Sequence, residues 1–113
     1  MRPVYAILFL ASASVATAQD VPKIDIGPSC RAAASGTLGA NQDFDSCRKS
    51  EEAARNILVN QWDSFPAADR GSCFRLTTTG TPGTYTELLT CLEMKRDARA
   101  LPDPEGLRKK LGN

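Results

Sequence analysis

The chain has 113 residues, of which 14 are Lys or Arg, 13 are Asp or Glu and none is His, so its formal net charge is only +1. A near-neutral chain lacks the basic excess through which proteins bind nucleic acids or anionic membranes, and we expect neither as a partner. Histidine is the usual general base near neutral pH. Its absence predicts a protein that is not an enzyme, with no catalytic residue and no cofactor.

Residues 1–18 are predicted to be a signal peptide that is removed from the mature protein. Arg2 precedes an unbroken apolar run at residues 4–10, and a small-x-small pattern follows at residues 16–18. We expect cleavage after Ala18. The apolar run is shorter than the roughly 20 residues that span a bilayer, so we expect it to be part of a cleaved signal and not a membrane anchor. After cleavage no membrane association is expected. The mature part has thirteen charges of each sign, and we expect it to be periplasmic or secreted.

Residues 19–43 are predicted to form an N-terminal arm and a loop. The stretch 19–27 is polar and contains Pro22 and Gly27, which favours an extended chain. Ser29 can cap one or two helical turns around Cys30. The glycines within residues 36–41 predict a loop before the helical part begins.

Residues 44–100 are predicted to form a helical domain, and its first helix is expected over residues 44–62. Asp43 or Asp45 can cap the free amides of the first turn. One face carries apolar residues at helical spacing. These residues are Cys47, Ala54, Leu58 and Trp62. On the polar side, Glu51 is expected to pair with Arg55 four residues later.

A second helix is predicted over residues 66–74, after a break that contains Pro66. Proline is tolerated in a first helical turn, and Ser64 can cap this one. The residues expected to be buried are Phe65, Ala68, Cys73 and Phe74. Asp69 and Arg70 are adjacent in the sequence, and we expect them to form an exposed ion pair of little energetic weight.

A third helix is predicted after the Thr- and Gly-rich loop at residues 77–83. Thr84 and Glu87 have the spacing of a capping box. The apolar stripe that follows consists of Tyr85, Leu88, Leu89 and Leu92. Arg96 and Asp97 are expected to form another surface pair. Pro102 ends the helix, so residues 101–113 are predicted to be a flexible tail. The predicted fold is an all-α, three-helix domain with an extended N-terminal arm.

The four cysteines predict a disulfide framework. Cys30, Cys47, Cys73 and Cys91 are widely spaced, without the close pairs that are typical of zinc sites or of redox motifs, so we expect no metal site. An even number in a short exported chain indicates two disulfides.

The pairing of the four cysteines is left open by the sequence. If the helices run up, down and up, Cys47 and Cys73 fall near the same end of the bundle. This geometry favours the nested pairing, Cys30–Cys91 with Cys47–Cys73. The sequential pairing, Cys30–Cys47 with Cys73–Cys91, stays an alternative, because the loop-closure free energies differ by only about 1 kcal/mol.

The segment WDSFP at residues 62–66 supports two hypotheses. Trp62 and Phe65 could form a surface for a protein partner, because aromatic anchors often dominate interfaces. They could instead belong to the core, as most large aromatic residues in small domains do. The core hypothesis is favoured, with Trp62 and Phe65 kept as a candidate partner surface.

Several segments together resemble small exported four-cysteine proteins of rhizobia and related alphaproteobacteria. They are residues 24–26, 28–32, 47–55, 62–70 (WDSFPAADR) and 85–97 (YTELLTCLEMKRD). This resemblance implies a periplasmic or secreted location and supplies no activity. More loosely, the chain is similar to periplasmic lysozyme-inhibitor-type helical domains. It departs from them in the Trp-x-x-Phe-Pro break and in the wide gap between Cys47 and Cys73, so no inhibitory residue is carried over.

These observations lead to two functional hypotheses. The first is an exported non-enzymatic interaction or structural domain, whose protein partner and oligomeric state the sequence does not indicate. The alternative is an inhibitor of a cell-wall hydrolase or protease, which the compact disulfide scaffold and the looser similarity favour.

Overall fold

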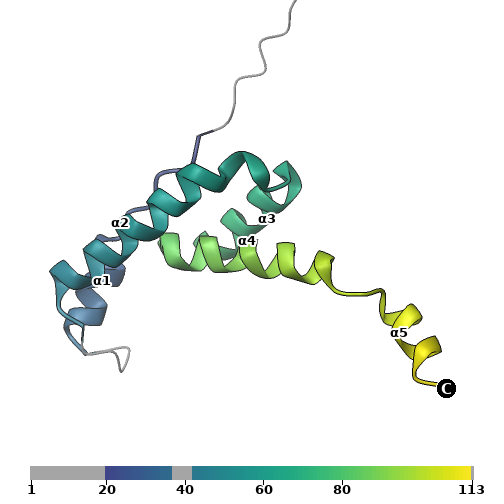
Figure 1. Ribbon diagram of the computed structural model, residues 1–113. Helices are drawn as coiled ribbons and strands as arrows, with labels where there is room; N and C mark the ends of the chain where they lie inside the picture. The colour runs from purple at the N-terminus through teal and green to yellow at the C-terminus, as the bar shows by residue number, and fades with distance from the viewer. Residues whose placement is uncertain (1–19, 37–41, 113) are drawn as a thin grey trace, which may run out of the picture.

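The computed structural model describes residues 20–36 and 42–112, apart from the side chain of residue 107. The predicted signal peptide lies outside these residues. Within the described part, the regular elements are all helical (Figure 1). They are α1 (Gly27–Ala34), α2 (Phe44–Gln61), the short 3-10 helix η1 (Trp62–Ser64), α3 (Ala67–Thr78), α4 (Tyr85–Ala100) and α5 (Pro104–Lys110). The all-α prediction is confirmed.

Helix α2 begins where the sequence predicts. The side chain of Asp43 accepts a hydrogen bond from the Ser46 amide at 2.9 Å, so Asp43 and not Asp45 is the cap. The buried face of the helix contains Cys47, Ala54 and Leu58, as the apolar spacing predicts. This face packs against α4 and, near its N-terminal end, against α1.

Helix α3 is longer than the sequence predicts. Phe65 is extended and Pro66 is the N-cap, so the break falls at the predicted position. The predicted cap is wrong, because the Ser64 hydroxyl donates to the Gln61 carbonyl at 2.6 Å and not to α3. The helix then continues to Thr78 instead of stopping at Phe74. Thr78 donates its hydroxyl hydrogen bond to the Phe74 carbonyl at 2.7 Å. Such bonds to the previous turn satisfy the polar side chains of this stretch inside the helix, and Thr77 of the same turn is buried.

Helix α4 has the predicted capping box. The hydroxyl of Thr84 accepts from the Glu87 amide at 3.0 Å, and the Glu87 carboxylate accepts from the Thr84 amide at 3.1 Å. All four residues of the predicted stripe are buried, namely Tyr85, Leu88, Leu89 and Leu92. The helix ends before Leu101, next to the predicted stop at Pro102.

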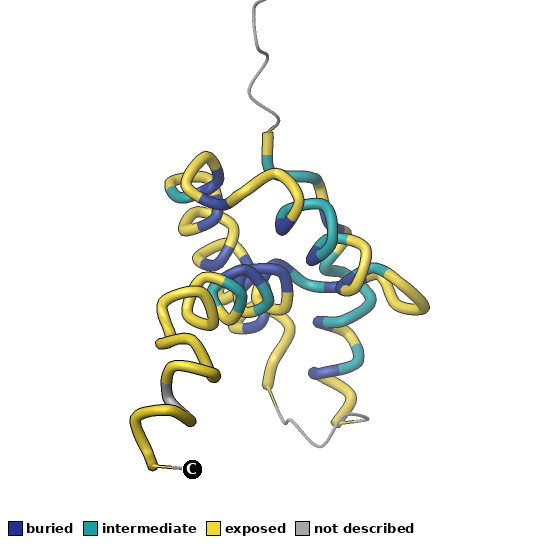
Figure 2. The backbone as a smooth tube through the Cα atoms, turned by 90° about the vertical axis from the view of Figure 1, so that its right-hand side faces the viewer, coloured by how far each residue is buried: buried dark blue, intermediate teal, exposed yellow. Residues whose placement is uncertain are grey.

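The main core lies between α2, α3 and α4 and includes part of the N-terminal arm. Ile24 is buried, and its amide donates to the Tyr85 hydroxyl at 2.9 Å. The buried members of this core are Ile24, Ala54, Leu58, Trp62, Phe65, Cys73, Tyr85, Leu88, Leu89 and Leu92. Figure 2 shows these inward-facing segments in dark blue. The described part of the arm before α1, residues 20–26, has no regular secondary structure and packs into the core through Ile24.

A second, smaller cluster lies between α1 and α2. Its buried residues are Cys30, Ala33 and Cys47, and Ile26 packs against it. Helix α1 contains the helical turns that the sequence predicts around Cys30, but it begins at Gly27, so Ser29 lies inside the helix and is not its cap. Because this cluster is separate from the main core, α1 is held mainly through its contact with α2.

The disulfides are sequential, so the nested pairing favoured by the sequence is wrong. Cys30 bonds to Cys47 and Cys73 bonds to Cys91, with Cα–Cα distances of 5.5 and 5.7 Å. The nested pairing assumes that α2 and α3 pack side by side. Instead, among the described residues, both helices pack against α4 and not against each other. Cys47 therefore meets α1, and Cys73 meets α4.

The C-terminal tail contains a short helix. Helix α5 follows α4 after a bend, and its described side chains are exposed (Figure 2). Among the described residues, no helix combines the length and the apolar character needed to cross a bilayer.

Candidate functional site

The two aromatic residues of the predicted partner surface are both buried. Trp62 is 6% exposed and Phe65 is 2% exposed. The extended backbone at Phe65 turns its ring inward, and the Arg96 guanidinium covers it with 5.8 Å between the guanidinium carbon and the ring centre. Burial supports the core hypothesis, and Phe65 offers no surface to a partner. Trp62 differs, because it also lines a pocket.

The pocket lies between the N-terminal arm and the first turns of α3. It has a volume of about 370 Å³ and opens to solvent. Its lining residues are Asp20, Pro22, Trp62, Arg70, Gly71 and Phe74. A concave site with apolar walls and a few polar groups is the usual form of a small-ligand site. The sequence indicated Trp62 as a binding residue, but it gave no indication of Arg70 or Phe74.

Arg70 is the cationic residue of this pocket. Its guanidinium carbon lies 5.3 Å from the centre of the Trp62 ring, within the range of a cation–π contact. The backbone amide of Arg70 donates to the Pro66 carbonyl at 3.0 Å, but its side chain forms no hydrogen bond or ion pair with any described residue. Its Nε–H and the Nε1–H of Trp62 are buried donors without an acceptor among those residues. Two residues that line the pocket thus each carry a buried donor without a partner, which costs about 1–3 kcal/mol.

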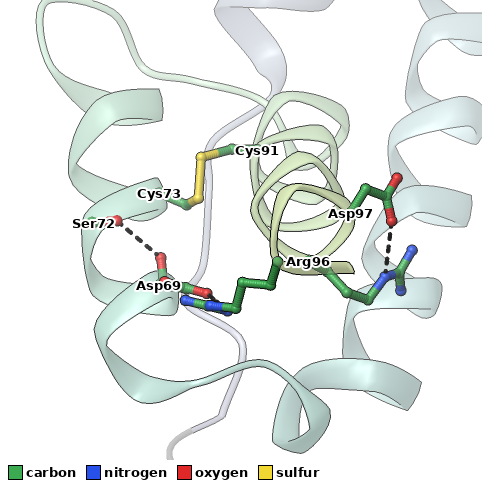
Figure 3. A network of polar contacts seen from close by, with 7 residues as sticks. Asp69, Ser72, Cys73, Cys91, Arg96 and Asp97 are labelled. Atoms are coloured by element: carbon green, nitrogen blue, oxygen red, sulfur yellow. Dashed lines mark hydrogen bonds and ion pairs between the residues drawn. A yellow bond between two sulfur atoms is a disulfide. The ribbon is translucent and has the colours of Figure 1, made fainter. Parts of the chain in front are cut away.

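Asp69 does not neutralise Arg70, although the sequence predicts this pair. Asp69 is buried and points to α4, where its carboxylate forms an ion pair with Arg99. Figure 3 shows Asp69 on the side of α3 that faces α4. The predicted pair is wrong because the Asp69 carboxylate is taken up by Arg99 across the contact between α3 and α4. The Arg99 hydrogen bond holds the pKa of Asp69 below its usual value.

The other predicted surface pair is present and weak. Arg96 and Asp97 approach to 3.5 Å, and both side chains are exposed (Figure 3). Arg96 also donates a hydrogen bond to the Gln61 side chain at 3.4 Å. These contacts lie over Phe65 and away from the pocket lining, so they add to the packing of α4 and not to the candidate site.

Glu51 has a structural role that the sequence analysis missed. It is buried, and its carboxylate accepts hydrogen bonds from the Tyr85 amide at 2.7 Å and from the Thr86 hydroxyl at 2.5 Å. Glu51 thus caps the start of α4 from α2 and does not pair with Arg55. The exposed pair on α2 is Arg48 with Glu52, at 2.9 Å. One signal was available, since Glu51 falls on the apolar stripe four residues after Cys47.

The cysteines and the buried carboxylates of the described part are already engaged in the fold. All four cysteines are disulfide-bonded, and within the described part no group of three or more potential metal ligands comes together. The two buried carboxylates, Glu51 and Asp69, are both occupied by structural partners. Among the described residues, the charged groups that line the cavity without an ion-pair partner are the Arg70 guanidinium and the Asp20 carboxylate.

Comparisons of the chain with family models, with curated proteins and with solved structures found no match.

Proposed function

We propose that this protein is an exported, non-enzymatic binding domain whose ligand occupies the pocket between the N-terminal arm and α3. The observation that carries the proposal is Arg70, a cation that rests on the buried Trp62 ring beside an open cavity and has no acidic partner among the described residues. A charged group that serves folding is normally paired, as Asp69 and Arg99 are. An unpaired one at a cavity favours ligand binding.

Export is supported by two independent features. Residues 1–18 have the pattern of a signal peptide. The two disulfides are typical of proteins that fold in an oxidising environment. Together they favour a periplasmic or secreted location.

The second disulfide supports a binding role because it fixes the wall of the pocket. Cys73 lies on α3 directly before Phe74 and three residues after Arg70, and it ties α3 to α4 through Cys91. A wall that is rigid before the ligand arrives loses little entropy on binding. The disulfide thus holds both lining residues in the geometry that a ligand would meet.

The proposal is tested by photocrosslinking from inside the pocket. Phe74 is replaced by p-benzoylphenylalanine, which keeps an aromatic ring at the wall. The matched control is the same replacement at Phe44, an exposed phenylalanine at the start of α2. Phe44 lies about 25 Å along the helix from Gln61, at about 1.5 Å per residue.

In native periplasm or culture medium, we expect a discrete adduct from position 74 that is absent from position 44 and lost when Arg70→Met is added. The same adducts from both positions, or adducts that survive the loss of Arg70, would contradict a ligand site at this pocket. The absence of any adduct from position 74 would contradict it too.

The alternative proposal is an inhibitor of a cell-wall hydrolase or protease. It is favoured by the loop between α3 and α4, whose residues 79–82 are exposed and which is enclosed by the Cys73–Cys91 disulfide. Exposed loops held by a rigid scaffold are frequent recognition sites. The test is the rate of lysozyme and of several serine proteases with and without the oxidised protein. A loss of rate that Thr81→Arg abolishes would support inhibition through this loop, and unchanged rates would remove it.

A further inference from the structure

The chemistry of the pocket walls defines which ligand would fit, if the pocket is the binding site proposed above. The Arg70 side chain has no acidic partner among the described residues. The buried donors without acceptors include its Nε but not its terminal Nη groups, so the Nη groups are the ones open to solvent. Guanidinium N–H groups match a carboxylate in a bidentate geometry. The cationic side of the pocket therefore favours a carboxylate.

The remaining walls favour an apolar group next to that carboxylate. Pro22, Trp62 and the half-buried Phe74 line the cavity. A small inorganic anion would leave these surfaces in contact with water, whereas an apolar side chain would cover them. A volume of about 370 Å³ lies at the low end of the range for small-molecule sites. It suits one or two residues and not a long chain.

Asp20 adds a hydrogen-bond acceptor on the arm side of the pocket. Its negative charge opposes a ligand that carries only a carboxylate and an aliphatic chain. A peptide bond instead brings an N–H donor close to its terminal carboxylate, and this donor can meet Asp20. The combination of Arg70, an apolar wall and Asp20 thus distinguishes a peptide end from a fatty acid.

We infer that the pocket binds the C-terminal residue of a peptide whose last side chain is apolar, with its carboxylate on Arg70, its side chain on Phe74 and Trp62, and its amide N–H on Asp20. This inference rests on the proposed binding function and names its ligand class. Capture of a chain terminus by its carboxylate is a known mode of peptide recognition.

The test uses the fluorescence of Trp62, which is the single tryptophan of the chain and lines the pocket. Oxidised protein is titrated with N-acetyl-glycyl-leucine, with its C-terminal amide, and with hexanoate. We expect a saturable change in emission for the free acid and at least tenfold weaker binding for the amide, which lacks the charge. Hexanoate carries no peptide N–H and is also expected to bind at least tenfold more weakly.

Two variants assign the binding to the site. Arg70→Met is expected to weaken binding of the free acid at least tenfold. Asp20→Asn is expected to weaken binding of the free acid severalfold without weakening binding of hexanoate. Arg55→Met is the control, since Arg55 is an exposed arginine of α2 that does not line the pocket. Thermal melts of all variants show whether they are folded. Because binding is also read from the peptide series on the unmodified protein, an unfolded variant does not decide the outcome.

Equal affinities for the free acid and its amide would overturn the role of the carboxylate. An affinity for hexanoate equal to that for the free acid would overturn the assignment of the ligand as a peptide. No saturable change with the free acid would overturn the ligand class. In that case the Arg70-dependent adduct from position 74 decides separately whether the pocket is a binding site at all.

Discussion

At the scale of single residues, the fold uses its two buried carboxylates to join helices that are distant in the sequence. Glu51 of α2 accepts from the first amides of α4, and Asp69 of α3 pairs with Arg99 near the end of α4. The two contacts lie at opposite ends of α4. They fix the position of α4 between α2 and α3. Because both carboxylates are buried in these helix contacts, neither lines the candidate pocket.

Glu51→Gln tests the first of these contacts. The amide that replaces the carboxylate carries an N–H₂ group and loses the charge that favours a helix N-terminus, so buried donors of α4 lose acceptors. We expect a loss of about 1–3 kcal/mol in the free energy of unfolding by urea. The neighbouring change Glu52→Gln, on the exposed side, should alter it by less than about 0.5 kcal/mol. Equal effects of the two changes would contradict the capping role.

Asp69→Asn tests the second contact through its pH dependence. Hydrogen bonding from Arg99, helped by the charges of Arg99 and Lys95 and opposed by burial, lowers the pKa of Asp69 in the folded state. A carboxyl whose folded pKa is lowered stabilises the protein above its unfolded pKa of about 3.9, and this contribution is lost as the pH falls through the folded pKa.

The difference in urea midpoint between the unmodified protein and Asp69→Asn should therefore be full at pH 7 and shrink below about pH 4. Asp97→Asn, which removes an exposed carboxylate, should give a small difference throughout. A difference for Asp69→Asn that stays constant down to pH 2 would contradict the lowered pKa.

At the scale of elements, the helix ends are set by local chemistry that can be checked one residue at a time. Gly83 precedes the capping box of α4 with φ of +76°, and a Cβ built there would lie 2.7 Å from the Thr77 carbonyl oxygen. Gly80 has a similar φ of +79° but nothing within 4 Å of such a Cβ. Substitution of Gly80 therefore introduces backbone strain alone, whereas substitution of Gly83 introduces the same strain and a steric contact with Thr77.

Gly80→Ala should lower the free energy of unfolding by about 1–2 kcal/mol, because it introduces only the strain of a left-handed residue. Gly83→Ala adds a steric clash between the loop residue before the α4 cap and Thr77 of α3, and we expect a loss of about 3 kcal/mol or more. The measurement is urea unfolding of both variants. Equal losses would show that the contact between Gly83 and Thr77 has no weight.

The elements also show what the sequence can and cannot predict. The Asp43 cap, the Thr84–Glu87 capping box and the apolar stripes are local patterns, and they located α2 and α4 to within one or two residues. The extent of α3 was missed because threonine has a low helix propensity, whereas Thr77 in the last turn is buried by tertiary packing.

The candidate site was missed for a different reason. Trp62 was recognised by residue type, but the pocket depends on where the arm crosses α3 and on which way Asp69 turns. Both are results of packing between segments that are far apart in the sequence. The disulfide pairing was mistaken for the same reason, since it follows from the position of α4 between α2 and α3.

At the scale of the whole molecule, each disulfide belongs to a different cluster. Cys30–Cys47 holds α1 on α2 in the small cluster, and Cys73 is fully buried in the main core that carries the pocket. The two closed loops are nearly equal, with sequence separations of 17 and 18. Loop-closure entropy therefore predicts that each disulfide stabilises the fold by about 3 kcal/mol. If removing the two disulfides lowers stability by different amounts, the difference must come from packing.

Removing the disulfides one at a time tests this division. Replacing Cys30 and Cys47 by Ala should lower stability by about 3 kcal/mol and leave the native emission of Trp62 unchanged, because the main core stays intact. Replacing Cys73 and Cys91 by Ala should cost more, because the change also leaves a cavity in the main core, and should shift the Trp62 emission. Both are measured by urea unfolding followed by fluorescence and circular dichroism. The reverse order of effects would contradict the assignment of the clusters.

The Cys73–Cys91 disulfide fixes α3 on α4 and so places Arg70 and Phe74 at the pocket. The geometry of the site therefore depends on the disulfide pairing. Trypsin separates the four cysteines onto four peptides, residues 24–31, 32–48, 71–75 and 76–95. Mass spectrometry of a non-reduced digest should find 24–31 linked to 32–48 and 71–75 linked to 76–95. A link between 24–31 and 76–95, or four free thiols, would contradict the fold and the site built on it.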